Sequence, residues 1–592
     1  MRMKKPAVVL ASAALLTLAA CGSSGGGGGN GGTNGTTGKF KGGGNAGATK
    51  VEHASGPVPI PKDAQKGGTL TVMTAGAPTT FDPTQAYYTD STAIDSDLVL
   101  RSLTMYRYNP QTKDMQLIPD LATNLGTPNS TNTAWTFKIK KGIKYEDGTP
   151  VKIEDFAYSV KRSFAIKELP DGPTYQTQFF LDGDKYKGPF TDGLNYNGVT
   201  VNKKQNSFTI KMRQPFTDMD YYGSFPIFTP IPQAKDNPQT YGQHPLATGP
   251  YKFASYQPGT ELKLVKNKYW DPKTDPGRIQ AVDGWDFKFG QDETKLLNEI
   301  ANDQGDAQTT LTYDNMDPAT YSKMQSDPSR VVLGTQPCTF MWYIDMRKVK
   351  DIRVRKAIGY AYPYKAAWKA GGEIVGITRV PGTSILPPGT AGRVKYDVLG
   401  NGGAYPEPSK AKALLKQAGY KPGQYKIKFL YAKDDTYAVA AEKQEAKGLQ
   451  QAGFNPQPIA STEETIRTDR TKYNSPINIR SSGWCSDWPD GGSWFPPQWD
   501  GSLVGLNGMP NIANFKEKDM DQLQHHILND LTPSQAIKAW GQFDKKMETK
   551  YYPAVNIGYG GVAMLHGSRV GGMFDDNVRG MPTLAQMYIT KQ

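Results

Sequence analysis

Residues 135–162 read WTFKIKKGIKYEDGTPVKIEDFAYSVKR and contain a strand, a turn and a helix in succession. The first six residues alternate apolar and polar side chains, which is the two-residue period of a strand with one buried face. Asp147 and Gly148 then form a turn signal, and a helix is predicted to follow. Apolar side chains recur at helical spacing at Ile153, Phe156, Ala157, Val160 and Phe164. This stretch predicts a mixed α/β fold.

A second stretch predicts a β-α-β unit. An amphipathic helix from Ser409 ends at Gly419, and the alternating strand Tyr425–Tyr431 follows it. Next come a helix at about residues 437–451 and the extended segment NPQPIAS. Two strands joined by a helix lie parallel in a sheet, so at least one lobe of the protein contains parallel strands.

The chain is too long for a single core. It has 592 residues, of which 11% are aromatic and 43 are proline. Single cores rarely grow beyond about 250–300 residues. We therefore expect a loop-rich α/β body with at least two lobes.

The first 20 residues have the pattern of an export signal. Basic residues precede the apolar run Ala7–Ala20. Because this run is shorter than the roughly 20 apolar residues of a membrane-spanning helix, we expect residues 1–20 to be removed. Leu-Ala-Ala before Cys21 resembles the lipobox of bacterial lipoproteins, in which the cysteine receives a diacylglycerol and becomes the new N-terminus. The alternative is an ordinary signal peptide with a chance cysteine.

Residues 21–66 are rich in Gly, Asn, Thr and Ser and offer few side chains to bury. Such a segment cannot offset the entropy of the chain, so we expect a lipidated flexible tether. Its r.m.s. reach is roughly 35–40 Å, from about 5–6 Å times the square root of its length. We expect the lipid on Cys21 to anchor the protein to the outer face of the cytoplasmic membrane and to be its only membrane contact.

The basic character of the chain does not indicate nucleic-acid binding. The formal net charge is +13 at pH 7, but Lys and Arg are scattered and form no single stripe. An exported, anchored protein meets no nucleic acid routinely. We therefore interpret the charge as a contribution to solubility and expect no nucleic-acid partner.

Two cysteines remain once Cys21 is assigned to the lipid. Cys338 and Cys485 would lie in an oxidising compartment, where a pair can form a disulfide. Two free thiols are the alternative, and the compartment favours the bridge.

The sequence lacks the motifs of the common enzyme and metal sites. Its five histidines form no His-Glu-x-x-His motif and no pair four residues apart. A Gly-x-Ser-x-Gly match at residues 22–26 has neither a preceding strand nor a following helix. We therefore expect a binding protein with no enzyme activity, no metal site and no cofactor.

A series of segments occurs along the chain in a recognisable order. They are GGTLTV (67–72), FDP (81–83), PDLAT (119–123), the stretch 135–162, ATGPYKF (247–253), NKYWDP (267–272), DIRVRKAIGYAY (351–362), YPEPSKAKALLKQAGY (405–420) and GWCSDW (483–488). Together they resemble the extracellular solute-binding proteins of ABC importers, in the group that binds oligopeptides, dipeptides, nickel chelates and some sugars (family 5). The resemblance spans nearly all of the mature chain.

The resemblance implies a two-lobe α/β fold of the periplasmic-binding-protein-like type II, with an extra domain inserted in the first lobe and a two-strand hinge between the lobes. Mapped by motif order, the first lobe comprises residues 67–107, 243–336 and 554–592, the inserted domain residues 108–242, and the second lobe residues 337–553. The ligand is enclosed between the lobes.

The resemblance also implies where the ligand binds. In oligopeptide-binding relatives a tryptophan and a following aspartate lie in the cleft, and the aspartate meets the α-amino group of the peptide. The matching residues here are Trp484 and Asp487, with a turn or helix cap as the alternative role for Asp487. Cys338 and Cys485 lie at the entry to the second lobe and beside the cleft, where a disulfide would clamp the hinge side. Further candidates for aromatic walls of the cleft are Trp488, Trp494, Trp342, Tyr87 and Tyr88.

These expectations combine into a substrate-binding lipoprotein. It would capture oligopeptides between two lobes and deliver them, as a monomer, to the permease subunits of an ABC transporter in the membrane. A non-peptide ligand such as a nickel chelate, haem or an oligosaccharide is the alternative within the same class. A structural cell-surface lipoprotein is the alternative from another class.

Overall fold

The computed structural model describes residue 47 and residues 49–505 and 511–592. The predicted signal peptide, Cys21 and most of the predicted tether lie outside these residues. None of the helices in the described ranges has the length and apolarity that crossing a membrane requires.

The first lobe contains a five-stranded sheet in the order β12-β2-β11-β10-β9. Its strands are β2 (Thr69–Met73), β9 (Tyr251–Gln257), β10 (Glu261–Lys266), β11 (Gly284–Lys288) and β12 (Thr310–Leu311). Strand β2 pairs in parallel with both β11 and β12. Leu70 and Val72 of β2 are fully buried, because alternate side chains of this strand face the core.

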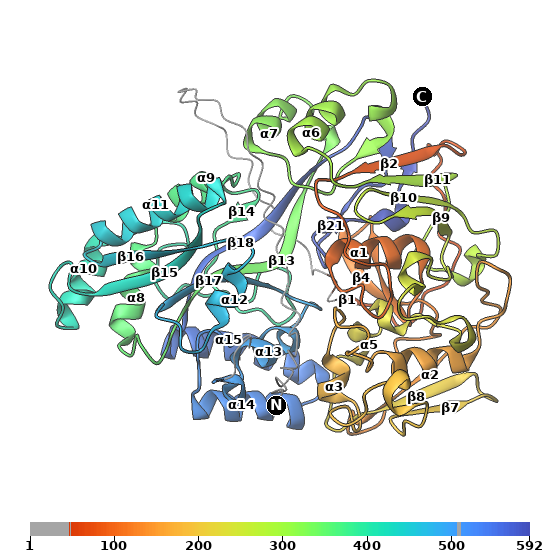
Figure 1. The fold of residues 1–592 in the computed structure, drawn as a ribbon, viewed down its shortest axis with the longest axis horizontal. Helices are drawn as coiled ribbons and strands as arrows, with labels where there is room; N and C mark the ends of the chain where they lie inside the picture. The colour runs from red at the N-terminus through yellow and green to blue at the C-terminus, as the bar shows by residue number, and fades with distance from the viewer. Residues whose placement is uncertain (1–46, 48, 506–510) are drawn as a thin grey trace, which may run out of the picture.

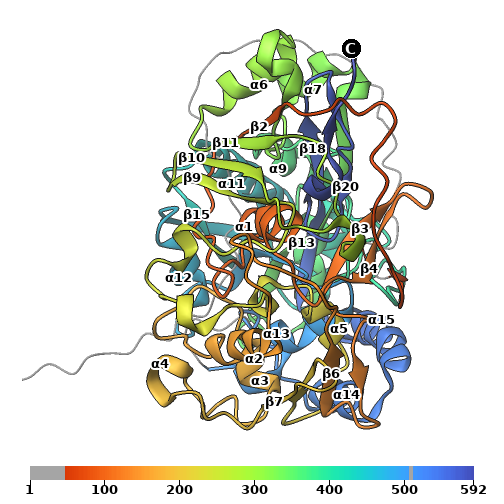
Figure 2. The same cartoon turned by 90° about the vertical axis from the view of Figure 1, so that its right-hand side faces the viewer.

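The inserted domain uses residues that lie in sequence between β2 and β9. Its four-stranded sheet has the order β5-β6-β8-β7, with β5 (Thr127–Pro128), β6 (Ala134–Lys138), β7 (Val199–Asn202) and β8 (Ser207–Lys211). Both views place this sheet below that of the first lobe (Figure 1, Figure 2). A second sheet of three strands, β1-β4-β3, contains β1 (Thr49–Lys50), β3 (Thr104–Asn109) and β4 (Asp114–Pro119).

The strand and helix predicted within residues 135–162 are confirmed as β6 and α2 (Ile153–Arg162). Trp135 and Phe137 of β6 are buried and pair across the sheet with apolar residues of β8. Arg162, the last residue of α2, is fully buried and forms ion pairs with Asp82 at 2.6 Å and with Asp236 at 2.8 Å. The helix thus ties the inserted domain to the first lobe.

The second lobe contains the predicted β-α-β unit. Strand β15 (Lys426–Ala432) pairs in parallel with β16 (Asn455–Ser461), and α11 (Thr436–Gln451) joins them. The preceding helix, α10 (Pro408–Gln417), is also confirmed. Ile427 and Phe429 of β15 are fully buried.

Two long strands connect the lobes. Strand β13 (Val331–Ile344) runs antiparallel to β18 (Ala554–Leu565), and the pair extends from one half of the molecule to the other (Figure 1). The register shifts between Thr335 and Thr339, so the pairing is interrupted near the middle of β13. Strands β14 (Arg379–Val380) and β17 (Ile479–Cys485) complete a sheet of order β14-β18-β13-β17. This is the two-strand connection that the resemblance implied.

The other α-helices of the described residues belong to the two lobes and the inserted domain. They are α1 (Thr89–Ile94), α3 (Tyr175–Phe179), α4 (Pro189–Asp192), α5 (Met219–Tyr222), α6 (Glu293–Asn302), α7 (Pro318–Met324), α8 (Ile352–Ala361), α9 (Tyr364–Ala370), α12 (Ile466–Thr471), α13 (Phe495–Trp499), α14 (Lys518–Asp530) and α15 (Pro533–Lys550). Short strands β19 (Val570–Gly571), β20 (Asp575–Asp576), β21 (Met581–Pro582) and β22 (Tyr588–Ile589) follow β18.

The predicted end of the tether at residue 66 is wrong. Residues 49–50 form β1, which pairs in parallel with β4, and Lys50 Nζ lies 2.6 Å from Asp220 Oδ2. Further on, the Gln65 N–H donates to the Ile589 carbonyl at 2.6 Å. The tether was inferred from the scarcity of apolar residues, but an ion pair and backbone hydrogen bonds also stabilise an ordered segment. The chain therefore packs on the folded body from residue 49 onwards.

Candidate functional site

A carboxylate of the second lobe meets hydroxyl groups of the first lobe and the inserted domain. Asp487 lies two residues after the end of β17. Tyr87, just before α1, donates to its two oxygens at 3.0 and 2.9 Å. Tyr175, the first residue of α3, donates to Asp487 Oδ2. The predicted residues Asp487 and Tyr87 are therefore brought together from separate lobes.

The Asp487 carboxylate has hydrogen-bond donors, and no counter-charge for it is found among the described residues. In the described ranges, no lysine, arginine or histidine forms an ion pair with Asp487. Burial raises the pKa of Asp487 to about 6, and the hydrogen bonds from Tyr175 and Tyr87 oppose that rise. Burial, together with the nearby charge of Asp487, raises the pKa of both tyrosines well above the ordinary value, so both stay protonated donors. The site can accept a positively charged group.

Strand β17 leads to this carboxylate and has one free edge. It is the last strand of its sheet, and β13 pairs with it on the other side. The Ser486 N–H donates to the Pro337 carbonyl at 2.9 Å, so the backbone groups of Ser486 point toward β13. Because backbone groups alternate along a strand, those of Gly483 and Cys485 point to the free edge. Strand β15 lies beside the start of this edge, where the Asn478 N–H donates to the Lys428 carbonyl at 3.0 Å, and no described strand forms a ladder with the part from Ser481 to Cys485.

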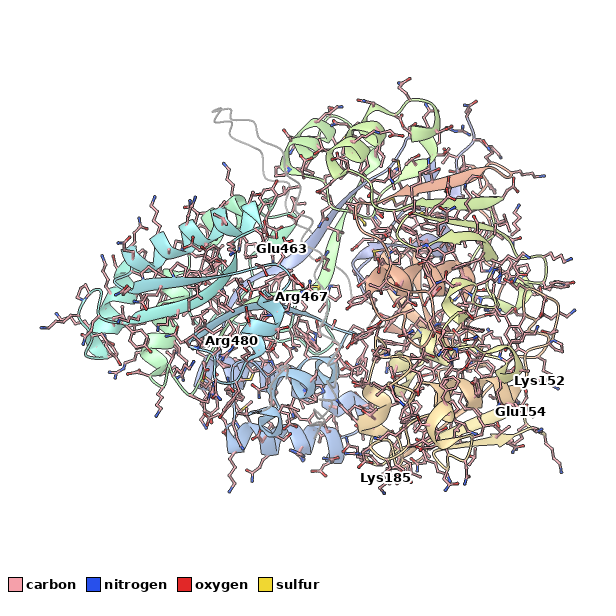
Figure 3. The ribbon with its side chains drawn as sticks, viewed as in Figure 1. Lys152, Glu154, Lys185, Glu463, Arg467 and Arg480 are labelled. Carbon is pink, nitrogen blue, oxygen red and sulfur yellow. A yellow bond between two sulfur atoms is a disulfide. The ribbon has the colours of Figure 1, made fainter. Side chains whose placement is uncertain are left out.

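An arginine lies at the far end of the same edge. Arg470, on α12, donates from Nη1 to the Ser481 carbonyl at 3.3 Å. Burial and the nearby charge of Arg467 lower the pKa of Arg470 to about 10. Figure 3 labels Arg467 and Glu463 on the side of the second lobe that faces the first, whereas Arg480 lies further inside. A negatively charged group beside Arg470 would offset this lowering of its pKa.

Cys338 and Cys485 form a disulfide. They are directly opposite each other in the antiparallel pair β13 and β17. The bond fixes the strand with the free edge to one of the two strands that connect the lobes.

The tryptophans do not line an open site. Trp342 and Trp494 are fully buried, and their assignment as ligand contacts stays a prediction. Trp342 packs in the core of the second lobe against Tyr362 and Phe429, with ring centroids 4.8 and 5.3 Å away. Strand β13 lies inside the protein and has core on both faces, so the alternation of its residues does not show which side chains reach a ligand.

Trp484 and Trp488 support the site rather than face it. Trp484 is 8% exposed, and its indole N–H donates to the Ser493 carbonyl at 3.0 Å. Trp488 is 1% exposed and packs against Tyr175 at 4.8 Å between ring centroids. Its indole N–H donates to Asp218 Oδ2 of the inserted domain at 3.0 Å. Trp488 therefore holds one of the tyrosines that contact Asp487.

Two tyrosines differ from the prediction: Tyr88 was predicted to contact the ligand, and Tyr175 was not. Tyr88 is half-buried, and its carbonyl accepts from the Thr92 N–H at the start of α1. The described residues show no hydrogen bond between its side chain and Asp487. Tyr175 was missed by the sequence analysis, because nothing in the aromatic segment around it distinguishes a ligand contact from core packing.

The site contains groups that can bind a ligand by hydrogen bonds and charge: two tyrosine hydroxyls, the backbone groups of the β17 edge and the Asp487 carboxylate. Across residues 49–505 and 511–592, no group of three or more His, Cys, Asp and Glu side chains is arranged to hold a metal ion.

Comparison with known proteins identifies related chains. Residues 116–503 match the family described as bacterial extracellular solute-binding proteins, family 5 (middle region). Di/tripeptide-binding protein 1 of Pseudomonas aeruginosa is 26% identical over 377 residues, 60% of this chain and 64% of that protein. The periplasmic oligopeptide-binding protein OppA of Salmonella typhimurium is 22% identical over 436 residues, 70% of this chain and 74% of that protein.

A solved structure has the same fold. Clavulanic acid biosynthesis oligopeptide binding protein 2 superimposes with a TM-score of 0.80 at 21% identity, covering 91% of this chain and 99% of that one.

Proposed function

The chain belongs to the bacterial extracellular solute-binding proteins of family 5, and we propose that it captures oligopeptides between its two lobes for an ABC importer. Its mixed α/β architecture is the two-lobe type II fold of these proteins. The ligand class, the anchoring and the delivery to a permease are part of the proposal.

The observation that carries the proposal is the position of Asp487 at the end of a free strand edge. Peptides of any sequence share only their backbone and their termini. The edge of β17 offers backbone groups at Gly483 and Cys485, and Asp487 offers a carboxylate that has no counter-charge within the described ranges. A peptide ammonium would supply the counter-charge that no described cation provides.

Arg470, at the other end of the β17 edge, favours one orientation of the bound peptide. Ser481, which Arg470 contacts, lies six residues before Asp487. Six residues of an extended strand span about 20 Å. A peptide with its ammonium at Asp487 would place its backbone along β17 and its carboxylate toward Arg470.

Calorimetry with matched peptides tests the proposal. The parent protein should bind free-amine peptides and bind their N-acetylated forms poorly. Asp487→Asn should cost about 2–5 kcal/mol of binding free energy for free-amine peptides, because it leaves a desolvated ammonium unpaired. It should change little for acetylated peptides. Asp182→Asn, at an exposed ion pair with Lys185, is the matched control and should bind like the parent.

Two results would overturn the peptide assignment. One is equal affinity of the parent for acetylated and free peptides. The other is native mass spectrometry of protein purified without denaturation that finds a non-peptide ligand between the lobes.

The anchoring and the partners complete the proposal. A lipid on Cys21 would hold the protein at the outer face of the cytoplasmic membrane, where it would act as a monomer and deliver its ligand to membrane permease subunits. The predicted lobe boundaries, at residues 107, 242, 336 and 553, are kept in this proposal.

A further inference from the structure

A second contact between the inserted domain and the second lobe consists of two carboxyl groups. Asp218, just before α5, is 8% exposed, and Asp490, two residues after Trp488, is 2% exposed. The two carboxyl groups lie side by side against Gly492, and each acts on the pKa of the other. Gly492 permits the approach, because a Cβ at this position would lie 2.3 Å from Asp218 Oδ2 and 3.0 Å from Asp490 Oδ1.

Hydrogen bonds place the shared proton on Asp490. Asp218 accepts from the Trp488 indole N–H and from the Thr217 hydroxyl, each at 3.0 Å, so it acts as the charged acceptor. Asp490 Oδ1 accepts from the Gly492 N–H at 2.7 Å, which leaves its second oxygen to donate to Asp218. Two buried carboxylates in contact cannot both be ionised at low cost.

The charges around the pair reinforce this assignment. Lys50 of β1 lies 2.6 Å from Asp220 and 4.1 Å above the ring centroid of Tyr221, and its charge also acts on both members of the pair. Tyr106 of β3 and Tyr221 of α5 are the other titratable groups that interact with Asp490, and both are neutral because burial raises their pKa well above the ordinary value. One ammonium therefore faces three carboxyl groups. Burial and the charge of Asp218 raise the pKa of Asp490 well above its ordinary value.

We propose that closure of the lobes takes up a proton at the contact between Asp218 and Asp490, so that ligand capture is coupled to pH. Asp490 belongs to the second lobe and Asp218 to the inserted domain. The contact therefore exists only when the second lobe is closed against the inserted domain. In an open form Asp490 meets water and is ionised at neutral pH. The inference rests on one part of the proposed function, namely that ligand binding closes the lobes.

The coupling has a defined direction. Because the closed form binds one more proton, raising the pH opposes closure by up to tenfold per pH unit, until the closed pair itself loses the proton. This direction is opposite to that of Asp487, which must be ionised to pair with an ammonium. N-acetylated peptides, which lack the ammonium, separate the two effects.

Scattering and calorimetry test the inference together. The radius of gyration of the ligand-free protein should rise between pH 5 and pH 8 in the parent. It should stay at the compact value in Asp490→Asn, because the amide N–H donates to Asp218 as the protonated acid does. Calorimetry of peptide binding at pH 7, in buffers of different ionisation enthalpy, should show proton uptake by the parent and a clear loss of that uptake in Asp490→Asn. Asp182→Asn should behave like the parent in both measurements.

Asp218→Asn is the second variant, since the amide that replaces the carboxyl group can accept from Trp488 and donate to an ionised Asp490. It should also abolish the pH dependence. A ligand-free radius that does not vary with pH in the parent, or that varies in both variants as it does in the parent, would overturn the inference. Failure of peptides to bind at all would contradict the proposed function, and the ligand-free scattering would still decide the inference.

Discussion

Tyr87 and Asp487, 400 residues apart in the sequence, are hydrogen-bonded across the two lobes at 3.0 and 2.9 Å. The contact joins a segment before α1 to the segment after β17. Through it, a hydroxyl group of the opposite lobe stabilises the ionised form of the carboxylate at the proposed amine site.

Binding of free-amine peptides should weaken in acid. Asp487 has a pKa of about 6, raised by burial, and an ammonium binds its ionised form. Below about pH 6 the carboxyl must first lose its proton, so affinity falls by up to tenfold per pH unit. The ratio of affinities for free-amine and acetylated peptides, measured by calorimetry from pH 5 to pH 7, removes any other pH effect. A constant ratio over this range would contradict the prediction.

Tyr87→Phe should move this pH dependence upward. The Tyr87 hydroxyl donates to the Asp487 carboxylate and lowers its pKa, so its loss raises that pKa further. The midpoint of the affinity ratio should then lie at a higher pH than in the parent. Tyr88→Phe is the matched control, since the described residues show no bond from its side chain to Asp487. An unchanged midpoint in Tyr87→Phe would mean that the hydroxyl does not stabilise the carboxylate in solution.

Loss of the disulfide should destabilise the fold. Cys338 and Cys485 are 147 residues apart in the sequence, and closing a loop of this length restricts the unfolded chain. The double variant to serine should lower the free energy of unfolding by about 2–5 kcal/mol. Denaturant titration of the parent, with and without reductant, provides the comparison. Detection of two free thiols by mass analysis of non-reduced exported protein would rule out the bond.

Lys50→Met should destabilise the protein although Lys50 falls within the predicted tether. The change leaves Asp220 and the pair Asp218 and Asp490 without their ammonium, and the expected loss is about 1–3 kcal/mol. Lys185→Met is the control, because Lys185 and its partner are both well exposed and such ion pairs contribute little to stability. Equal free energies of unfolding for the two variants would show that residues 49–50 do not stabilise the folded protein.

Cys21→Ser should release the protein from the membrane or leave it unprocessed. The serine hydroxyl cannot form the thioether to a diacylglycerol. Fractionation of cells that express the parent, Cys21→Ser and Ser23→Ala should show a change only for the cysteine variant. Membrane partitioning of Cys21→Ser equal to that of the parent would exclude the lipid anchor.

The sequence by itself determined the local elements. The alternation in residues 134–140 and the helical spacing from Ile153 predicted β6 and α2, and the same patterns predicted β15, α11 and β16. These patterns are local, because burial of one face imposes a fixed period on neighbouring residues. The cysteine count and the expected compartment favoured the bridge between Cys338 and Cys485, and family resemblance added Asp487, which depends on order along the chain.

Only the tertiary structure decided which side chains meet. Trp342 and Trp494 are aromatic like Tyr87, yet they lie in the core, and Tyr175 had no local signal at all. Lys50 lies in a polar segment that composition alone assigns to a tether, and its ordering depends on Asp220, which is 170 residues further along the chain. Such contacts depend on how the lobes and the inserted domain pack together, and a periodic pattern within one segment contains no information about residues that the fold brings from elsewhere.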